Sequence, residues 1–113
     1  MALTTNTQSN SNGVANMAVG KIVTDAGAAA DTTIALGFVP RVVRFYNVTD
    51  RIIDEWLEGM AAFSSIHHIA AGTITLEATN GISVNAGPGS AGSFTVKAAT
   101  ILASKTFAWE AYA

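Results

Sequence analysis

The sequence contains no cysteine, only two prolines and few charged side chains. The lack of cysteine excludes disulfide bonds, thiolate zinc sites and cysteine nucleophiles. Charged residues make up 12% of the chain, six Lys or Arg and eight Asp or Glu, against about 25% in ordinary soluble domains. Because so weakly charged a surface repels other protein surfaces poorly, the composition favours a protein that lies against others.

Basic runs and long apolar runs are also missing. With a formal net charge of -2, the chain lacks the electrostatic attraction that drives most nucleic-acid binding. No apolar stretch approaches the roughly 20 residues of a membrane span. Residues 1–10 have neither the basic nor the apolar region of a secretory signal. We therefore expect no nucleic-acid partner, no membrane partner and no export by that route.

A chain of 113 residues is too short for more than one domain. Residues 1–20 differ from the rest, because they carry no charged side chain, are rich in Thr, Asn, Ser and Gln, and show no helical or strand period. They predict an extended, flexible N-terminal arm ahead of a β-sandwich domain over residues 21–113. Leu3, Val14, Met17 and Val19 would let this arm dock on a neighbouring protein; the alternative is a frayed terminus without a role.

Short runs typical of β-strands fill the rest of the chain. Residues 32–38, 72–78 and 105–112 alternate apolar with polar or small side chains. Residues 42–48 carry large apolar groups on both faces, which is typical of a central or interface strand. Asn80-Gly81 predicts the turn of a β-hairpin. About eight short strands, with turns every eight to twelve residues, predict an all-β fold, a small β-sandwich of the jelly-roll type.

The segment over residues 51–60 has a different periodicity. Its large apolar side chains fall at positions i, i+1, i+4, i+5 and i+8, occupied by Ile52, Ile53, Trp56, Leu57 and Met60. Taken alone, this spacing indicates an amphipathic helix, with Asp50 as its N-cap.

The titratable side chains do not assemble into a catalytic or metal site. Adjacent residues on a strand point to opposite faces, so His67 and His68 cannot share a metal ion, and we expect an exposed polar pair. Asp54, Glu55 and Glu58 form a carboxylate cluster, for which we expect solvated or inter-subunit charge. No nucleophile, base and orienting group occur at a diagnostic spacing. We expect no enzymatic activity, no metal and no cofactor.

The aromatic side chains suggest an alternative function. Trp56, Trp109, Tyr46 and Tyr112 could line a carbohydrate-binding face, since flat rings stack on sugar rings. In a small sandwich, such residues more often lie in the core and at interfaces. The exposure of the two tryptophans in the folded protein distinguishes these alternatives.

Four stretches of the sequence carry a resemblance to a known family. They read GFVPRVV over residues 37–43, NVTDR over 47–51, EWLEGMA over 55–61 and ASKTFAW over 103–109. In these stretches the chain resembles the head decoration, or cement, proteins of short-tailed bacteriophages. The similarity extends from about residue 20 to the last residue and does not include the predicted arm.

The resemblance implies a jelly-roll subunit, usually a homodimer, bound on the outside of an icosahedral head across neighbouring major capsid proteins. It also implies that residues 55–60 are extended, against the helical spacing. The expected function is a structural virion protein, made in the host cytoplasm, that cements the capsid against the pressure of its DNA. The alternative is a carbohydrate-binding β-sandwich module on a virion. We expect the capsid or subunit contact at Leu3, Val14, Met17, Val42, Tyr46, Val48 and Trp56.

Overall fold

The computed structural model describes residues 2–10, 16–86 and 92–113, and this part of the chain is all-β, as predicted. The strands are β1 (Leu3–Asn10), β2 (Met17–Thr24), β3 (Thr32–Ala35), β4 (Val42–Asn47), β5 (Ile52–Leu57), β6 (Ser64–His68), β7 (Ile74–Asn85), β8 (Ser93–Val96) and β9 (Thr106–Tyr112). A short helix, α1 (Ala98–Ile101), precedes β9. Within the described residues, no helix is long and apolar enough to cross a membrane.

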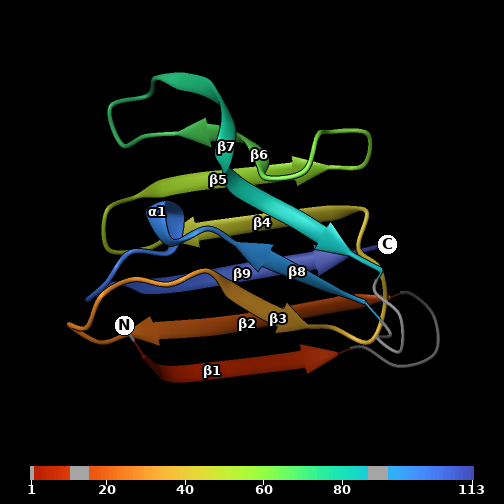
Figure 1. Ribbon diagram of the computed structural model, residues 1–113, viewed down its shortest axis with the longest axis horizontal. Coiled ribbons are helices and arrows are strands. Elements are labelled where there is room, and N and C mark those ends of the chain that lie inside the picture. The colour runs from red at the N-terminus through yellow and green to blue at the C-terminus, as the bar shows by residue number, and fades with distance from the viewer. Residues whose placement is uncertain (1, 11–15, 87–91) are drawn as a thin grey trace.

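The strands form one antiparallel sheet in the order β1-β2-β9-β4-β5-β6-β7-β8-β3. The sheet curls, so that β8 and β3 lie across β9 and β2 (Figure 1). The two layers touch directly, since the ring of Phe94 on β8 meets the ring of Trp109 on β9 edge-on, with centroids 5.3 Å apart. The fold is therefore two-layered and sandwich-like. The jelly-roll connectivity is not confirmed, because the described strands belong to one continuous sheet.

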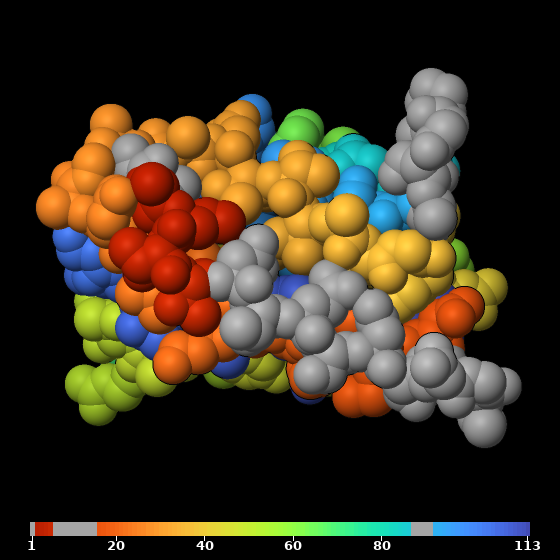
Figure 2. All heavy atoms as spheres, turned by 90° about the horizontal axis from the view of Figure 1, so that it is seen from below, coloured from red at the N-terminus to blue at the C-terminus, as the bar shows by residue number. Residues whose placement is uncertain are grey.

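The hydrophobic core fills the space between the two layers. Its large, fully buried side chains are Trp109, Phe45, Phe94, Phe107, Ile22, Ile82, Ile101, Val43 and Val96. Along β4 and β9 half-buried and buried residues alternate, so each strand has one face toward the core and one away from it. Figure 2 shows the molecule from the side of β1, the edge strand of the sheet. The stretch around β3, in orange to yellow, lies in the upper part of this view.

Strand β7 links the two layers. Its first half pairs with β6 and its second half with β8, and the register with β6 shifts between Ser64 and Ser65. Gly81 lies at this change, where a Cβ atom would come within 2.7 Å of the Ser64 backbone. Only glycine permits so close an approach of two backbones. The predicted hairpin turn at Asn80-Gly81 is therefore wrong, because the strand continues through these residues.

Residues 52–57 form strand β5, which confirms the extended alternative for residues 55–57, whereas residues 58–60 form a turn. A spacing of four residues returns to the same side of a helix and also to the same face of a strand, so the apolar pattern fits both. In the strand, Trp56 lies opposite the buried Val43, whereas Ile53 lies opposite Tyr46 on the other face. The helical interpretation of residues 51–60 is wrong because both faces of β5 carry apolar side chains.

The predicted arm over residues 1–20 is not confirmed as a separate segment. β1 pairs with β2 from Leu3 opposite Thr24 to Asn10 opposite Ala18. β2 crosses the expected boundary at residue 20 and pairs with β9 along its length. A composition rich in polar residues does not prevent this, because the backbone groups of any sequence can pair with a neighbouring strand.

Candidate functional site

One side of the sheet faces away from the core, and we call it the outer face. It consists of alternate residues of β2, β9, β4, β5, β6 and the first half of β7, which the strand registers place side by side. Its large apolar and aromatic side chains are Met17, Val19, Val42, Tyr46, Ile53, Leu57, Ile66, Ile74, Leu76 and Tyr112. Met17 is 40% exposed, Ile74 61% and Leu76 70%. Such a gathering of exposed apolar surface is typical of an interaction site.

A row of charged side chains crosses the middle of the outer face. Arg44 lies between two carboxylates, with its Nε 3.0 Å from Glu55 Oε2 and its Nη1 3.0 Å from Glu110 Oε1. The hydrogen bond to Glu110, and then that to Glu55, raise the pKa of Arg44. Nε2 of His68 lies 3.2 Å from the other oxygen of Glu55. One guanidinium between two carboxylates leaves the row with a formal charge of -1 when His68 is neutral.

Two tyrosines flank this charged row. Tyr46 Oη donates to Glu110 Oε1 at 3.1 Å, and Arg44 donates to Tyr112 Oη. Burial, followed by the charge of Glu110, raises the pKa of Tyr46, so its phenol keeps the proton that it donates. The Arg44 guanidinium carbon lies 5.7 Å from the centroid of the Tyr112 ring. The polar atoms of Arg44, Glu55, Glu110 and the two tyrosines thus bond to one another, whereas Nε2 of His68 has no hydrogen-bond partner among the described residues. Rings and aliphatic side chains surround them.

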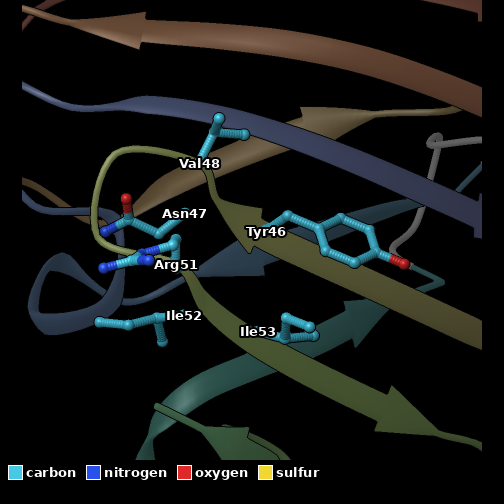
Figure 3. Close-up of a pocket in the computed structure, with 6 residues that line it drawn as sticks. All are labelled: Tyr46, Asn47, Val48, Arg51, Ile52 and Ile53. Carbon is cyan, nitrogen blue, oxygen red and sulfur yellow. The ribbon is translucent and has the colours of Figure 1, made fainter. Parts of the chain in front are cut away.

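A hollow of about 280 Å³ lies at the edge of the outer face, where β4 turns into β5. Its walls are formed by Tyr46, Asn47, Val48, Arg51, Ile52 and Ile53 (Figure 3). Val48 is 56% exposed at this site. Arg51 is the one charged residue of the lining, and within the described residues it forms no ion pair. The hollow is therefore an apolar depression with an unpaired cation beside it.

The turn at this hollow, residues 47–51, is fixed by side-chain hydrogen bonds. The Asp50 amide donates to Asn47 Oδ1, and Asn47 Nδ2 donates to Asp50 Oδ2, both at 2.9 Å. Lys105 Nζ lies 3.1 Å from Asp50 Oδ1, and this hydrogen bond is the main cause of the lowered pKa of Asp50. The first amide of β9 donates to Thr49 Oγ1 at 2.9 Å. These contacts hold the turn against β9.

The opposite, inner side of β5 carries one buried carboxylate. The side chain of Asp54 is 3% exposed, and its Oδ1 lies 2.8 Å from Ser65 Oγ and 2.8 Å from His67 Nδ1. Because a carboxylate only accepts hydrogen bonds, Nδ1 of His67 carries a proton in this arrangement. The expectation of solvated charge at Asp54 is therefore wrong.

His67 and His68 point to opposite faces, as predicted, since His67 contacts Asp54 on the inner side and His68 contacts Glu55 on the outer face. The expectation of an exposed polar pair is wrong, because both rings are half-buried against carboxylates. In the described ranges, no three His, Cys, Asp or Glu side chains come close enough to hold a metal ion.

Four of the seven predicted contact residues come together in the structure. Met17 and Val42 lie on the outer face, opposite Tyr112 on either side of β9. Tyr46 and Val48 line the hollow at its edge. Their role in a contact stays a prediction, but they share one surface.

The remaining three predicted contact residues do not lie on this surface. Leu3 is half-buried and packs against the core. Trp56 points inward, is 8% exposed, and donates its Nε1 proton to the carbonyl oxygen of Ala61. Val14 is outside the described residues. Since Trp109 is also buried, the two tryptophans do not form the exposed platform that carbohydrate binding requires.

Sequence reasoning missed several side chains of the outer face. Arg44 and Glu110 each alternate with buried aromatic residues, which is a readable signal for the face opposite the core. Ile74 and Leu76 alternate with threonines, and this pattern predicts core residues rather than exposed ones. No sequence signal identifies the hollow, because its walls come from two strands and the turn between them.

The comparisons with protein-family models, with curated proteins and with solved structures each find no match to this chain.

Proposed function

We propose that this protein is a structural, non-enzymatic virion component that binds the outer surface of a bacteriophage capsid through its outer face. In this role it bridges neighbouring major capsid proteins and opposes the outward pressure of the packaged DNA. The observation that carries the proposal is the outer face itself, where apolar and aromatic side chains surround a charged row whose members already pair with one another. The sequence resemblance to head decoration proteins supplies the capsid as the partner.

The size of the outer face supports this role. The molecule measures 37 × 30 × 24 Å, and the shortest axis runs through the two layers (Figure 1). The outer face therefore spans the two long dimensions, a footprint on the order of 1,000 Å². A standard protein interface buries about 800 Å² on each partner. One subunit can form such an interface with this face alone.

The energetics of cementing require little from each copy. A protein that binds the assembled lattice better than the separated capsid subunits stabilises the lattice by mass action. Many copies act at once, so a few kcal/mol per copy are enough. Because the charged row across the middle of the outer face is already paired within the molecule, the contact depends mainly on apolar and neutral groups. We therefore expect attachment to tolerate high salt.

Three finer features accompany the proposal as predictions. The jelly-roll connectivity and an arm that docks on a neighbour follow from the sequence. A homodimer is predicted because the apolar side chains of residues 42–48 on the outer face leave apolar surface that a second subunit would bury. Sedimentation of the purified protein at tens of micromolar tests the dimer, and a clean monomer would contradict it. The alternative of a carbohydrate-binding module is weaker, because Trp56 and Trp109 are buried.

The proposed function is tested on the phage that encodes this chain. Purified virions should contain the protein, and electron microscopy should show its density on the outside of the capsid. Particles stripped of the protein should keep their shape but release DNA at a lower temperature than intact particles. Re-addition of the purified protein should restore the heat resistance.

Two matched variants locate the contact. Val42→Glu adds a charge on the outer face and should weaken rebinding to stripped particles at least tenfold. Val39→Glu, which changes an exposed valine in the loop before β4, should rebind like the unmodified protein. Absence of the protein from virions, or equal heat resistance of stripped and intact particles, would contradict the cement function.

A further inference from the structure

We propose that the hollow between β4 and β5 is an anchor pocket that receives a large apolar side chain lying next to a carboxylate on the capsid protein. This inference rests on the proposed function and adds the chemistry of the recognised segment. Three properties of the hollow carry it: its volume, its unpaired cation and its fixed walls.

The volume of the hollow suits one side chain. An apolar cavity of about 150 Å³ is known to accept benzene, and pockets for drug-sized ligands begin at about 300 Å³. At about 280 Å³, this hollow accommodates an aromatic ring or a long aliphatic side chain. Its walls from Tyr46, Val48 and Ile53 offer aromatic and aliphatic contacts, so the group that enters is apolar.

The charge beside the hollow determines what accompanies that side chain. Arg41, Arg44, Lys97 and Lys105 each form an ion pair. Among the described residues, Arg51 has no such partner, although it lines the hollow. Its planar guanidinium binds a carboxylate through two parallel hydrogen bonds, which neither a neutral nor a cationic group can provide. The complementary segment therefore carries Asp, Glu or a terminal carboxylate next to its apolar side chain.

The backbone at Arg51 is fixed before binding. Its φ of 57° lies in the left-handed region, which is unfavourable for residues other than glycine by about 1 to 2 kcal/mol. The hydrogen bonds between Asn47 and Asp50, together with the Lys105 contact, hold the turn in this conformation. A preorganised site loses less conformational entropy on binding than a flexible loop. The backbone therefore carries the Arg51 side chain at the hollow without a rearrangement of the turn.

Small probes test the pocket in the isolated protein. Phenylacetate combines an aromatic ring with a carboxylate, and phenylacetamide is its neutral counterpart. In methyl NMR titrations, phenylacetate should shift the signals of Val48 and Ile53 with a millimolar dissociation constant, and phenylacetamide should bind at least fivefold more weakly. Equal binding of the two probes, or no shift with either, would overturn the inference.

Substitutions at the two unpaired cations distinguish an effect of the Arg51 charge on binding from an effect on the fold. Arg51→Gly removes the guanidinium but suits the positive φ, so thermal stability should be unchanged or higher while the preference for phenylacetate disappears. Lys21→Gln is the matched control, because Lys21 is the other cation without an ion pair in the described residues and lies on the outer face two strands from Tyr46. It should leave phenylacetate binding unchanged. If Arg51→Gly still prefers phenylacetate to phenylacetamide, or if Lys21→Gln loses this preference to the same extent, the anchor pocket is contradicted.

Rebinding to stripped particles distinguishes this inference from the proposed function. Arg51→Gly should rebind at least tenfold more weakly than the unmodified protein, and Val39→Glu, outside the outer face, should rebind normally. If Arg51→Gly rebinds normally, the anchor pocket is wrong while the capsid function stands. If the unmodified protein does not bind particles at all, the proposed function fails, whatever the probes show. If Arg51→Gly instead dissociates a homodimer and leaves capsid binding intact, the occupant is a second copy of this chain and the inference is overturned.

Discussion

Two neighbouring residues of β5 show how differently the two faces of the sheet hold a carboxylate. Asp54 points inward, with its side chain 3% exposed, and depends on Ser65 and His67 for its hydrogen bonds. Glu55 points outward, is 23% exposed, and is paired with Arg44, which also has a second carboxylate partner. Asp54 is shielded from water, and its hydrogen-bond donors have no second carboxylate to turn to. Glu55 is in contact with water, and its partner Arg44 has a second carboxylate in Glu110.

This difference extends to the whole sheet. On the inner face, almost every side chain is buried against the second layer, so substitutions there should act on the free energy of unfolding. On the outer face, apolar side chains remain half-buried or exposed, so substitutions should act mainly on association. We therefore expect stability and association to depend on alternate residues of the same strands.

The largest effect is expected for a pair of neighbours on β4. Phe45→Ala removes a ring that is 1% exposed and stacked on Phe107, and should lower the free energy of unfolding by about 3 to 5 kcal/mol. Tyr46→Ala, on the outer face, should cost less than about 1.5 kcal/mol, the usual contribution of one hydrogen bond. Urea denaturation measures both. If Phe45→Ala does not fold, Phe45→Leu is measured in its place. A loss of unfolding free energy no larger than that of Tyr46→Ala would refute the contrast between the two faces.

The next effect concerns the two carboxylates of β5. Asp54→Ala leaves the Ser65 hydroxyl and His67 Nδ1 without their acceptor, which should cost about 1 to 3 kcal/mol. Glu55→Ala should cost at most about 1 kcal/mol, because Arg44 keeps Glu110 as a partner in a partly exposed ion pair. The two variants are compared by chemical denaturation at neutral pH. Equal costs would show that burial does not distinguish the two faces.

A smaller effect is expected at acid pH from the turn beside the hollow. The hydrogen bond from Lys105 lowers the pKa of Asp50 in the folded protein. A carboxyl group with a lowered folded pKa stabilises the fold above its unfolded value of about 3.9 and loses this contribution as pH falls through the folded pKa. The melting temperature of the unmodified protein should therefore fall on acidification, beginning below about pH 5.

Asp50→Asn isolates this contribution. Its melting temperature at pH 7 should be lower than that of the unmodified protein, and the difference should shrink as the pH falls. A difference that is independent of pH would show that the Asp50 charge does not contribute.

The smallest effect on stability is expected at the exposed end of the outer face. Leu76→Thr changes a side chain that is 70% exposed, so the free energy of unfolding should change by less than about 0.5 kcal/mol. Rebinding to stripped particles should nevertheless weaken several-fold if Leu76 belongs to the contact. Thr75→Ala, on the other face of the same hairpin, is the control and should rebind normally. A clear loss of stability in Leu76→Thr would place this residue in the fold rather than in the contact.

Local alternation in the sequence predicts much of the fold. In β4 and β9 a strict period of two separates buried from outward residues, and the structure follows it. The segment over residues 51–60 resists this reasoning, because its spacing of four suits both a helix and a two-sided strand. The deciding contacts of Asp54 and Glu55 come from other strands, and sequence spacing does not reveal them. β1 and the bend at Gly81 were missed for the same reason, since both depend on neighbours far along the chain.

The candidate site was predicted less completely than the fold. The two-sided apolar pattern of residues 42–48 identified Val42, Tyr46 and Val48, which do share a surface. Trp56 was misplaced because an aromatic residue at an interface and one in the core have the same local sequence signal. The unpaired state of Arg51 is visible only once the partners of the other cations are known.

The central position of β9 has a consequence for how the protein is made. This strand lies between β2 and β4, and Ile22 pairs with Phe107, which is 85 positions later in the chain. Contacts so distant in sequence form slowly, and the first strands remain without their neighbour until the ribosome has delivered residues 106–112. The two halves of the outer face also join only when β9 inserts. A growing chain would therefore have no complete outer face before β9 is in place.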